Sequence, residues 1–433
     1  MNRHILRLAI PNILSNLSVP LLGAVDTAVI GHLDKVYYLG AIAVGSIVFD
    51  FIFWGFGFLR MGTTGLVAQA FGAGDERESR RILLRVLIVA VSASIFILLL
   101  QWPILEFSLF IVDASDEVEF YMRKYYQIRI FAAPATLALF GLNGWFLGMQ
   151  NARFPMYITI LLNLLNILLN LVFVLKFNLN VSGVAWGSLI SSYVAVGFAV
   201  FLYRLRYGNY DLVFNWESIL NKTELKKFFS VNSDIFIRTL CLIFSYAFFT
   251  AKSAESGDIV LAANTILLQL WYISAYGVDG FAFAAESLVG RFYGANDRKN
   301  LVKAIKWSLI WGLGLGLAGT LIYWLTGTSL IRIFTDQEVV IIAASMVLFW
   351  TILAPLVNSI CFIWDGVYIG ATATSAMRNS MLFATLLVFI PVYYLTCEEV
   401  GVHALWLSML AFMVARGITL TILAPRHIFK HNI

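Results

Sequence analysis

The stretch Gln69-Ala70-Phe71-Gly72-Ala73-Gly74-Asp75-Glu76-Arg77 decides the fold, because a diverged copy of it stands far along the chain. The copy reads Arg291-Phe292-Tyr293-Gly294-Ala295-Asn296-Asp297-Arg298-Lys299. Subtracting 72, the number of one central glycine, from 294, that of its counterpart, gives an offset of 222 in a chain of 433 residues. An offset of about half the chain is too long for one unit of a solenoid, so it indicates two copies of a whole bundle.

Two further pairs of segments match at the same offset. Leu39-Gly40-Ala41 stands opposite Leu261-Ala262-Ala263, and Asn143-Gly144 stands opposite Asp365-Gly366. Three separated matches in one ungapped register predict that the chain arose by duplication.

The composition places both copies in a membrane. Hydrophobic residues make up 60% of the chain and charged residues 13%, and the mean hydropathy is +0.83. A soluble core cannot hide that much apolar surface. Runs long enough to cross about 30 Å of hydrocarbon predict twelve spans, and helices are expected because a membrane barrel would show alternation instead. The spans cover 8–31, 36–71, 80–107, 118–149, 154–176, 182–204, 225–252, 257–293, 299–327, 337–370, 376–396 and 401–424.

The distribution of cations predicts the orientation in the membrane. Most lysines and arginines lie at one set of alternate helix ends, whereas the opposite set has fewer and includes an acidic loop at 113–119. We therefore expect both termini in the cytoplasm. The same bias accounts for the formal net charge of +5, so no nucleic-acid partner is implied.

The spans predict a division into an N lobe at 1–203, a cytoplasmic linker at 204–224 and a C lobe at 225–433. Six spans separate equivalent points of the two copies, so both copies enter the membrane from the same side. The expected fold class is an all-α integral membrane protein with twelve transmembrane helices in two six-helix lobes, related by a pseudo-two-fold axis along the membrane normal. Two such lobes enclose a cavity, which is the geometry of a transporter.

Asp26 is the clearest ionisable residue inside a span. A charged side chain at the centre of a membrane helix costs about 3 kcal/mol on insertion scales, so its presence needs a reason. Desolvation favours the neutral carboxyl, which suits this side chain to gaining and losing a proton. The alternative is a structural acid paired with a neighbouring donor.

The fifth span carries Asn163, Asn166 and Asn170, spaced i, i+3 and i+7, so the three amides share one helical stripe. Amides can hold a carboxylate or a cation without adding charge. The alternative is hydrogen bonding between helices, worth about 0.6 kcal/mol per contact.

Two prolines, Pro11 and Pro20, lie in the first span and remove backbone hydrogen bonds, which creates places where the helix could bend. A bendable helix that carries a titratable acid is a plausible switch. The alternative is a static kink of the kind that membrane helices tolerate.

The second half carries its own ionisable residues within spans. Asp234 and Arg238 stand one turn apart and could pair within a helix. Asp279, Glu286 and Asp365 lie in apolar surroundings with no cation within one turn, so they are candidates for lining the cavity. A structural role for these three acids is equally open.

A set of separated motifs runs in one order along nearly the whole chain. The set comprises Pro11, Asp26, Gly62–Gly74, Val231–Thr239 and Asp279–Glu286. It resembles the multidrug and toxic compound extrusion family, specifically its DinF-type branch. The resemblance implies a twelve-helix antiporter that exports varied, often cationic compounds against an inward flow of protons or sodium ions.

The resemblance also implies roles for individual residues. The family's first-helix acid falls on Asp26, and its proline linked with bending falls on Pro11. A fourth-helix amide near the acid falls on Asn143, and the polar pair of the fifth helix falls on Asn166 and Asn170. Some relatives have an acid at the second position of that pair, so the amide here leaves Asp26 as the main titratable group in this part of the N lobe.

A hydroxyl near the same site falls on Ser188, in the segment Gly183–Ser188. We therefore expect a multi-pass antiporter of the cell (inner) membrane, acting as a monomer on small-molecule substrates, with no cofactor and with H⁺ or Na⁺ as the coupling ion. The expected ion site is Asp26 assisted by Asn143, Asn166, Asn170 and Ser188, with Pro11 as the bending point. The expected substrate-cavity candidates are Asp279, Glu286, Asp365, Asp234 and Arg238.

Two other classes of protein are weighed against this expectation. A flippase for lipids or lipid-linked precursors would share the two-lobe fold but would need a strongly cationic cavity, and the predicted buried charges are mainly acidic. A membrane-embedded enzyme would need a nucleophile-base or metal constellation. The five histidines lie at helix ends or tails, and Cys241, Cys361 and Cys397 form no CxxC pair, so neither an enzyme nor a metal site is expected.

Overall fold

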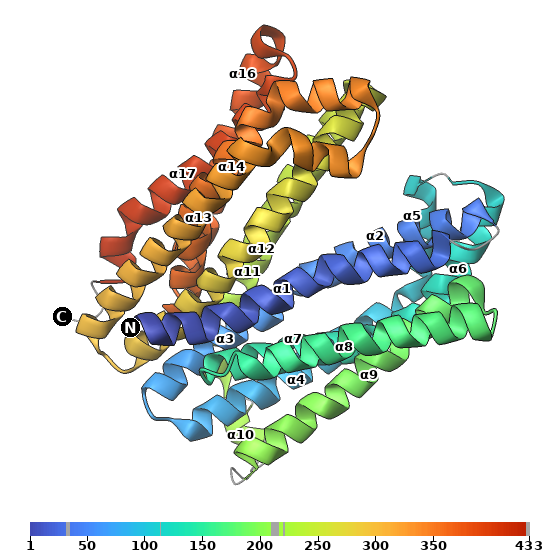
Figure 1. The fold of residues 1–433 in the computed structure, drawn as a ribbon. Helices are drawn as coiled ribbons and strands as arrows, with labels where there is room; N and C mark the ends of the chain where they lie inside the picture. The colour runs from blue at the N-terminus through green and yellow to red at the C-terminus, as the bar shows by residue number, and fades with distance from the viewer. Residues whose placement is uncertain (32–34, 113, 209–215, 220, 430–433) are drawn as a thin grey trace. The chain divides into compact units, whose positions relative to one another are not determined.

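The computed structural model describes the backbone of residues 1–31, 35–112, 114–208, 216–219 and 221–429, and the side chains there except those of 19–31, 36, 112 and 218. Within these ranges the ordered elements are all helices (Figure 1). The first half contains α1 (Asn2–Gly31), α2 (Val36–Gly55), α3 (Phe58–Gly72), α4 (Glu76–Leu99), α5 (Gln101–Val112), α6 (Asp116–Arg129), η1 (Ile130–Ala132), α7 (Ala133–Gly148), α8 (Arg153–Leu171), η2 (Val172–Lys176), α9 (Asn180–Tyr207) and the short α10 (Trp216–Ile219).

The second half contains longer helices. They are α11 (Lys222–Glu255), α12 (Asp258–Gly294), α13 (Arg298–Phe334), α14 (Glu338–Gly370), α15 (Thr374–Phe383), η3 (Ala384–Phe389), α16 (Ile390–Val400) and α17 (His403–His427). Eleven helical segments of the described chain are long and apolar enough to cross a membrane. The 30-residue α1 supplies the twelfth span, so the number of spans agrees with the prediction.

Two predicted spans contain breaks that hydropathy alone did not reveal. The span predicted at 36–71 is interrupted between α2 and α3, where Phe56 and Gly57 close the turn. The span predicted at 80–107 stops at Leu100, and α5 begins immediately after it. Apolar side chains continue through both breaks, which is why the hydrophobic pattern did not show them.

The repeated stretch forms the same helix start twice. Asp75 caps α4 by accepting a hydrogen bond of 2.9 Å from the backbone N–H of Glu78. Asp297 caps α13 by accepting one of 3.0 Å from the backbone N–H of Asn300. Such caps satisfy a backbone donor that the helix leaves unpaired at its start, so the duplication is preserved at the level of single hydrogen bonds.

The loops that follow corresponding helices are duplicated as well. Gly74 and Asn296 have φ values of +72° and +54°, and Gln150 and Thr372 have φ values of +61° and +51°. Each pair is separated by 222 residues (296 − 74 and 372 − 150). Left-handed backbone is uncommon outside glycine, so its recurrence at the predicted offset supports two copies of one fold.

The described chain divides into two compact units whose boundaries depart from the predicted lobes. One unit comprises 1–13, 64–74 and 227–433, and the other comprises 14–63 and 75–226. The start of α1 and the end of α3 thus belong with the second half of the chain. Residues 209–215 and 220 of the predicted linker lie outside the described residues.

A close helix crossing explains why segment 64–74 belongs to the first unit. A Cβ on Gly72 would lie 1.9 Å from the carbonyl oxygen of Arg291, and a Cβ on Gly294 would lie 2.0 Å from that of Gln69. Residues 69 and 291 are themselves 222 apart, so the α3–α12 contact is reciprocal. Only glycine allows backbones to approach this closely.

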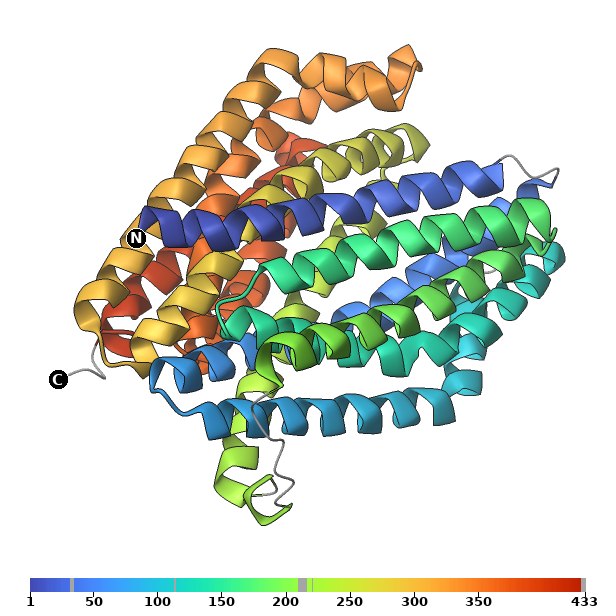
Figure 2. The same cartoon turned by 60° about the horizontal axis from the view of Figure 1, so that its bottom comes forward.

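Each unit is a bundle of neighbouring helices. In the first unit α12, α13 and α14 lie side by side and α17 packs on α14 (Figure 1). In the second unit α8 packs along α9, and α4 packs along α7 (Figures 1 and 2). Large apolar side chains such as Leu99 and Leu395 are about three-quarters exposed, at 74% and 75%, as expected for helices whose outer faces meet lipid rather than water.

Candidate functional site

A cluster of amides and hydroxyls lies inside the second unit, between α8 and α9. The Asn166 side-chain nitrogen donates to Ser188 Oγ at 2.9 Å and to Ser191 Oγ at 3.4 Å. The Asn170 nitrogen donates to Asn166 Oδ1 at 2.8 Å. All four side chains are buried, so the structure brings together three of the residues named from the sequence in a neutral polar network within a membrane span.

The α9 backbone makes room for this network. A Cβ on Gly187 would lie 2.0 Å from Asn170 Oδ1. The glycine next to Ser188 therefore allows the α8 amide to approach α9 without displacement. Any larger residue at Gly187 would force the Asn170 side chain away from its position.

The third amide of the stripe, Asn163, is bonded to α1. Its side-chain nitrogen donates to Ser18 Oγ at 2.8 Å and to the Ser18 carbonyl oxygen at 3.3 Å. Ser18 stands eight residues before Asp26, about two helical turns. The Asp26 side chain lies outside the described residues, although the α1 backbone is helical through Gly31.

The other candidates of the first half, Asn143 and Pro11, lie on helices other than α8 and α9. Asn143 lies on α7, and its buried Oδ1 has no hydrogen-bond partner among the described residues. Pro11 is buried in α1, which remains one continuous helix from Asn2 to Gly31. The proline therefore removes a backbone donor here without dividing the helix.

A charged cluster lies inside the first unit and gives Asp365, which has no cation within one turn of its own helix, two cationic partners from other helices. Asp365 on α14 accepts hydrogen bonds at Oδ2 from Nη2 of Arg238 on α11 and from Nη2 of Arg416 on α17, the latter at 2.5 Å. The three side chains are buried. The two cations come from helices distant in sequence, so a search within one turn of Asp365 could not find them.

Arg416 is the member of this cluster that the sequence did not single out. It is only 1% exposed, donates to Met413 Sδ at 3.0 Å, and lies with its guanidinium 5.2 Å from the ring centre of Phe412 and 5.9 Å from that of Phe362. These aromatic faces add cation–π contacts to the ion pair. An arginine in the middle of an apolar span was itself a signal that a buried acid should stand opposite.

Asp234 and Arg238 do not form the pair that their spacing suggested. Asp234 accepts a 2.6 Å hydrogen bond from Arg378 Nη1 and a 2.9 Å bond from Thr374 Oγ1. Arg238 donates to Asp365 instead, so Asp234 and Arg238, which stand one turn apart on α11, bind different partners. Asp234 thereby joins α11 to α15.

The other two acids of the second half lie on α12. Asp279 is half-buried, and Glu286 is 1% exposed. A Cβ on Gly370 would lie 2.4 Å from the Glu286 carbonyl oxygen, so α14 packs tightly against this acid's backbone. Both side chains remain candidates for interaction with a substrate.

The second unit contains an acid and an arginine that the sequence reading did not single out. Asp50 on α2 is exposed and interacts electrostatically with Arg129 of α6. The Arg129 guanidinium lies 5.3 Å from the ring centre of Phe49 and 5.6 Å from that of Tyr125. Asp50 stands inside an apolar helix, so, like Asp26, it carries the free-energy cost of an ionisable side chain within a membrane span.

A duplicated bundle of twelve spans with polar clusters buried inside them defines a membrane transporter. The family model MatE matches the chain twice, at residues 11–172 and 235–395. The two matches begin 224 residues apart and end 223 apart (235 − 11 and 395 − 172), close to the offset of the repeat. The chain belongs to the MatE family, the multidrug and toxic compound extrusion transporters, in its DinF-type branch, and is not an enzyme.

Individual relatives cover nearly the whole chain. The DNA damage-inducible protein F of Escherichia coli K12 is 36% identical over 420 residues, spanning 97% of this chain and 91% of that protein. The multidrug export protein MepA of Staphylococcus aureus is 22% identical and spans 94% of this chain and 90% of its own length. Both similarities extend over nearly the whole chain, so they support the family assignment for both of its halves.

Solved structures show the same fold. A crystal structure of a MATE protein in the bent conformation superposes with a TM-score of 0.90 at 18% identity, covering 99% of this chain and 95% of that one. The Vibrio cholerae MATE transporter VcmN in the bent form gives a TM-score of 0.88 at 18% identity, covering 99% of this chain and 97% of that one. The predicted all-α fold of twelve transmembrane helices in two lobes is confirmed.

Proposed function

We propose that the chain is a proton-coupled multidrug antiporter, which exports varied, often cationic amphiphilic compounds by alternating access. We place it in the cell (inner) membrane as a monomer with both termini in the cytoplasm. The observation that carries the proposal is the buried amide and hydroxyl network of α8 and α9, linked through Asn163 to the helix that contains Asp26. A neutral network of this kind can stabilise a carboxyl in either protonation state.

A proton is the proposed coupling ion because the network needs no rearrangement to receive it. Asn166 Oδ1 already accepts from Asn170, and the hydroxyl oxygens of Ser188 and Ser191 already accept from Asn166. A hard cation is held by several oxygen ligands at once. A proton carried by Asp26 needs one acceptor, so it can be accommodated without dismantling these bonds.

Protonation of Asp26 is proposed to act through α1. The charge state of the acid changes how α1 packs on α8, and the Asn163–Ser18 hydrogen bond is a described connection between those helices. Pro11, which lacks an N–H, is the place where α1 bends in response. Asn143 is assigned to the same ion site through its buried, unbonded carbonyl oxygen.

The second-half residues are assigned different tasks. The Asp365 carboxylate is occupied by Arg238 and Arg416, so this cluster holds helices together rather than binding a cationic substrate. Asp279 and Glu286 are the proposed substrate-recognising acids. Their carboxyl groups would attract a cation that the surrounding apolar residues also accept.

The flippase alternative is not favoured by the described charges. A headgroup bearing phosphates requires buried cations that are available to bind it. Arg238 and Arg416 share Asp365, and Arg378 is bonded to Asp234. The clustered cations of the first unit are therefore engaged with acids of the protein.

The test is transport of ethidium into proteoliposomes with a proton gradient or a sodium gradient imposed separately. The wild type should accumulate ethidium with the proton gradient alone. Asp26→Asn should bind ethidium and elute as a folded protein, yet fail to accumulate it. Asp336→Asn, at an exposed acid between α13 and α14, is the matched control and should behave as the wild type. Accumulation by Asp26→Asn, or wild-type accumulation driven by sodium alone, would contradict the proposal.

A further inference from the structure

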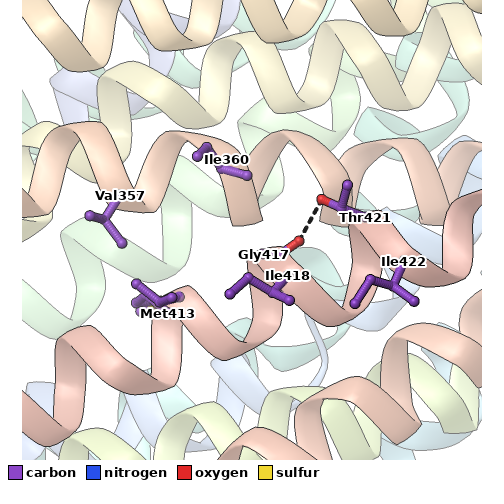
Figure 3. A pocket seen from close by; sticks show the side chains of 8 residues that line it. Val357, Ile360, Met413, Gly417, Ile418, Thr421 and Ile422 are labelled. Atoms are coloured by element: carbon purple, nitrogen blue, oxygen red, sulfur yellow. Dashed lines mark hydrogen bonds between the residues drawn. The ribbon is translucent and has the colours of Figure 1, made fainter.

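An apolar groove lies in the first unit, between α14 and α17. Its volume is about 300 Å³. Val357 and Ile360 line it from α14, and Met413, Gly417 and Ile422 line it from α17 (Figure 3). The figure shows these side chains arranged along the two helices with the backbone of Gly417 between them.

The exposed apolar side chains of the groove suit contact with lipid. Both helices are membrane spans, and the groove residues Ile418 and Ile422 are 54% and 69% exposed. The hydroxyl of Thr421 donates to the Gly417 carbonyl oxygen at 2.6 Å, the dashed line of Figure 3. The hydroxyl is thus satisfied within its own helix, and the groove suits a hydrocarbon chain.

A single glycine creates the space. A Cβ on Gly417 would lie 3.3 Å from Ile360 Cγ2, so any side chain here would project toward the opposite wall. From Met413 to Ile422 the groove extends over nine helical steps, about 14 Å at the helical rise per residue. Its volume is about twice that of a roughly 150 Å³ cavity that holds one benzene molecule. These dimensions suit a segment of an acyl chain.

A cation lies about one helical turn beyond the groove residue Ile422. Ile418, Ile422 and Arg426 are spaced at four-residue intervals, so they lie on one face of α17. Arg426 is exposed in the last turn of the helix, where a span reaches the headgroup region. A guanidinium at that level is complementary to a lipid phosphate.

We propose that the groove and Arg426 together form a binding site for an anionic phospholipid. One acyl chain occupies the groove beside Gly417, and the phosphate group pairs with Arg426. The site is built by α14 and α17, whereas the proposed ion and substrate residues lie on α1, α7, α8, α9 and α12. Its existence does not depend on which ion or drug the transporter uses.

Native mass spectrometry of the full-length protein in detergent tests the proposal. The probes are phosphatidylglycerol and phosphatidylcholine with identical acyl chains, mixed at equal concentration. A basic residue near the headgroup is worth about 1 kcal/mol, so the wild type should bind phosphatidylglycerol about five-fold more. Arg426→Gln should reduce that ratio to about one while retaining lipid adducts. Arg298→Gln, at an exposed arginine of α13, should keep the wild-type ratio.

Filling the groove tests the acyl-chain contact separately from the headgroup contact. Gly417→Leu should lower the adducts of both lipids several-fold. Thr421→Trp, which fills the groove from its rim, provides a second variant if Gly417→Leu does not fold. Equal wild-type binding of the two lipids, an unchanged ratio in Arg426→Gln, or unchanged adducts in the folded groove variants would overturn the proposal.

Discussion

Replacing Asp365 by Asn should destabilise the transporter more than any single change to the arginines bound to it. The carboxylate accepts from both Arg238 and Arg416, whose side chains are 9% and 1% exposed. Removing one partner of a buried ion pair costs about 3–5 kcal/mol because an uncompensated charge remains. Asp365→Asn leaves two such charges beside each other, and its amide oxygen retains part of the hydrogen bonding, so we expect a loss of about 5 kcal/mol.

Arg416→Met makes the contrasting change. It leaves one arginine with one carboxylate and fills the space with an apolar side chain, and exchanging buried charges for apolar volume is often close to neutral. We expect a loss below about 2 kcal/mol. Thermal unfolding of the purified protein in detergent, followed by tryptophan fluorescence, distinguishes the two variants.

At about 2 °C per kcal/mol for a large domain, Asp365→Asn should lower the Tm by roughly 10 °C. Asp258→Asn, at an exposed acid at the start of α12, is the control and should leave the Tm unchanged. A decrease below about 2 °C for Asp365→Asn, or a larger decrease for Arg416→Met, would refute the role assigned to this carboxylate.

Gly72→Ala should lower the free energy of unfolding by about 3 kcal/mol through overpacking at the α3–α12 crossing. Gly314→Ala, with no atom within 4 Å of the added carbon, should leave it unchanged, and the Tm values of the two variants test this difference. The backbone N–H of Asn300 holds the pKa of Asp297 below its usual value, so this cap stabilises above about pH 4 and is lost as the pH falls through the lowered pKa. Asp297→Asn should therefore reduce the fall of the Tm at acidic pH. An unchanged fall would contradict the stabilising role of this cap. Asn166→Ala should lower stability by about 1–3 kcal/mol because buried polar partners lose their bonds, and an unchanged denaturation midpoint would contradict the network.

The duplicated scaffold was predictable because the sequence features that indicate it do not depend on tertiary packing. Apolar runs are visible within a short window of sequence, and the pair Gly72 and Gly294 becomes visible when the chain is compared with itself at an offset of 222. The capping roles of Asp75 and Asp297 were not predicted, although each acts through a residue three positions later. The stripe of amides on α8 was similarly predictable because helical periodicity alone places Asn166 and Asn170 on one face.

The ionic contacts were not predictable because they join distant helices. Arg416 reaches Asp365 across 51 residues, and Arg378 reaches Asp234 across 144. Spacing within one helix suggested that Asp234 would pair with Arg238, but tertiary packing gave each a different partner. Segment 64–74 likewise belongs with the second half of the chain because of backbone contacts that hydropathy does not encode.

The α3–α12 crossing has a consequence for the origin of the chain. The two close contacts of this crossing are equivalent under the repeat. Gly72 lies against residue 291, and Gly294, the counterpart of Gly72, lies against residue 69, the counterpart of residue 291. An isologous interface between two identical half-length proteins has this property, so an unfused ancestor could have assembled as a homodimer through the same glycines. In such a dimer every substitution at the crossing would occur twice. In the joined chain the two facing positions differ, as Gln69 and Arg291, whereas both glycines are present.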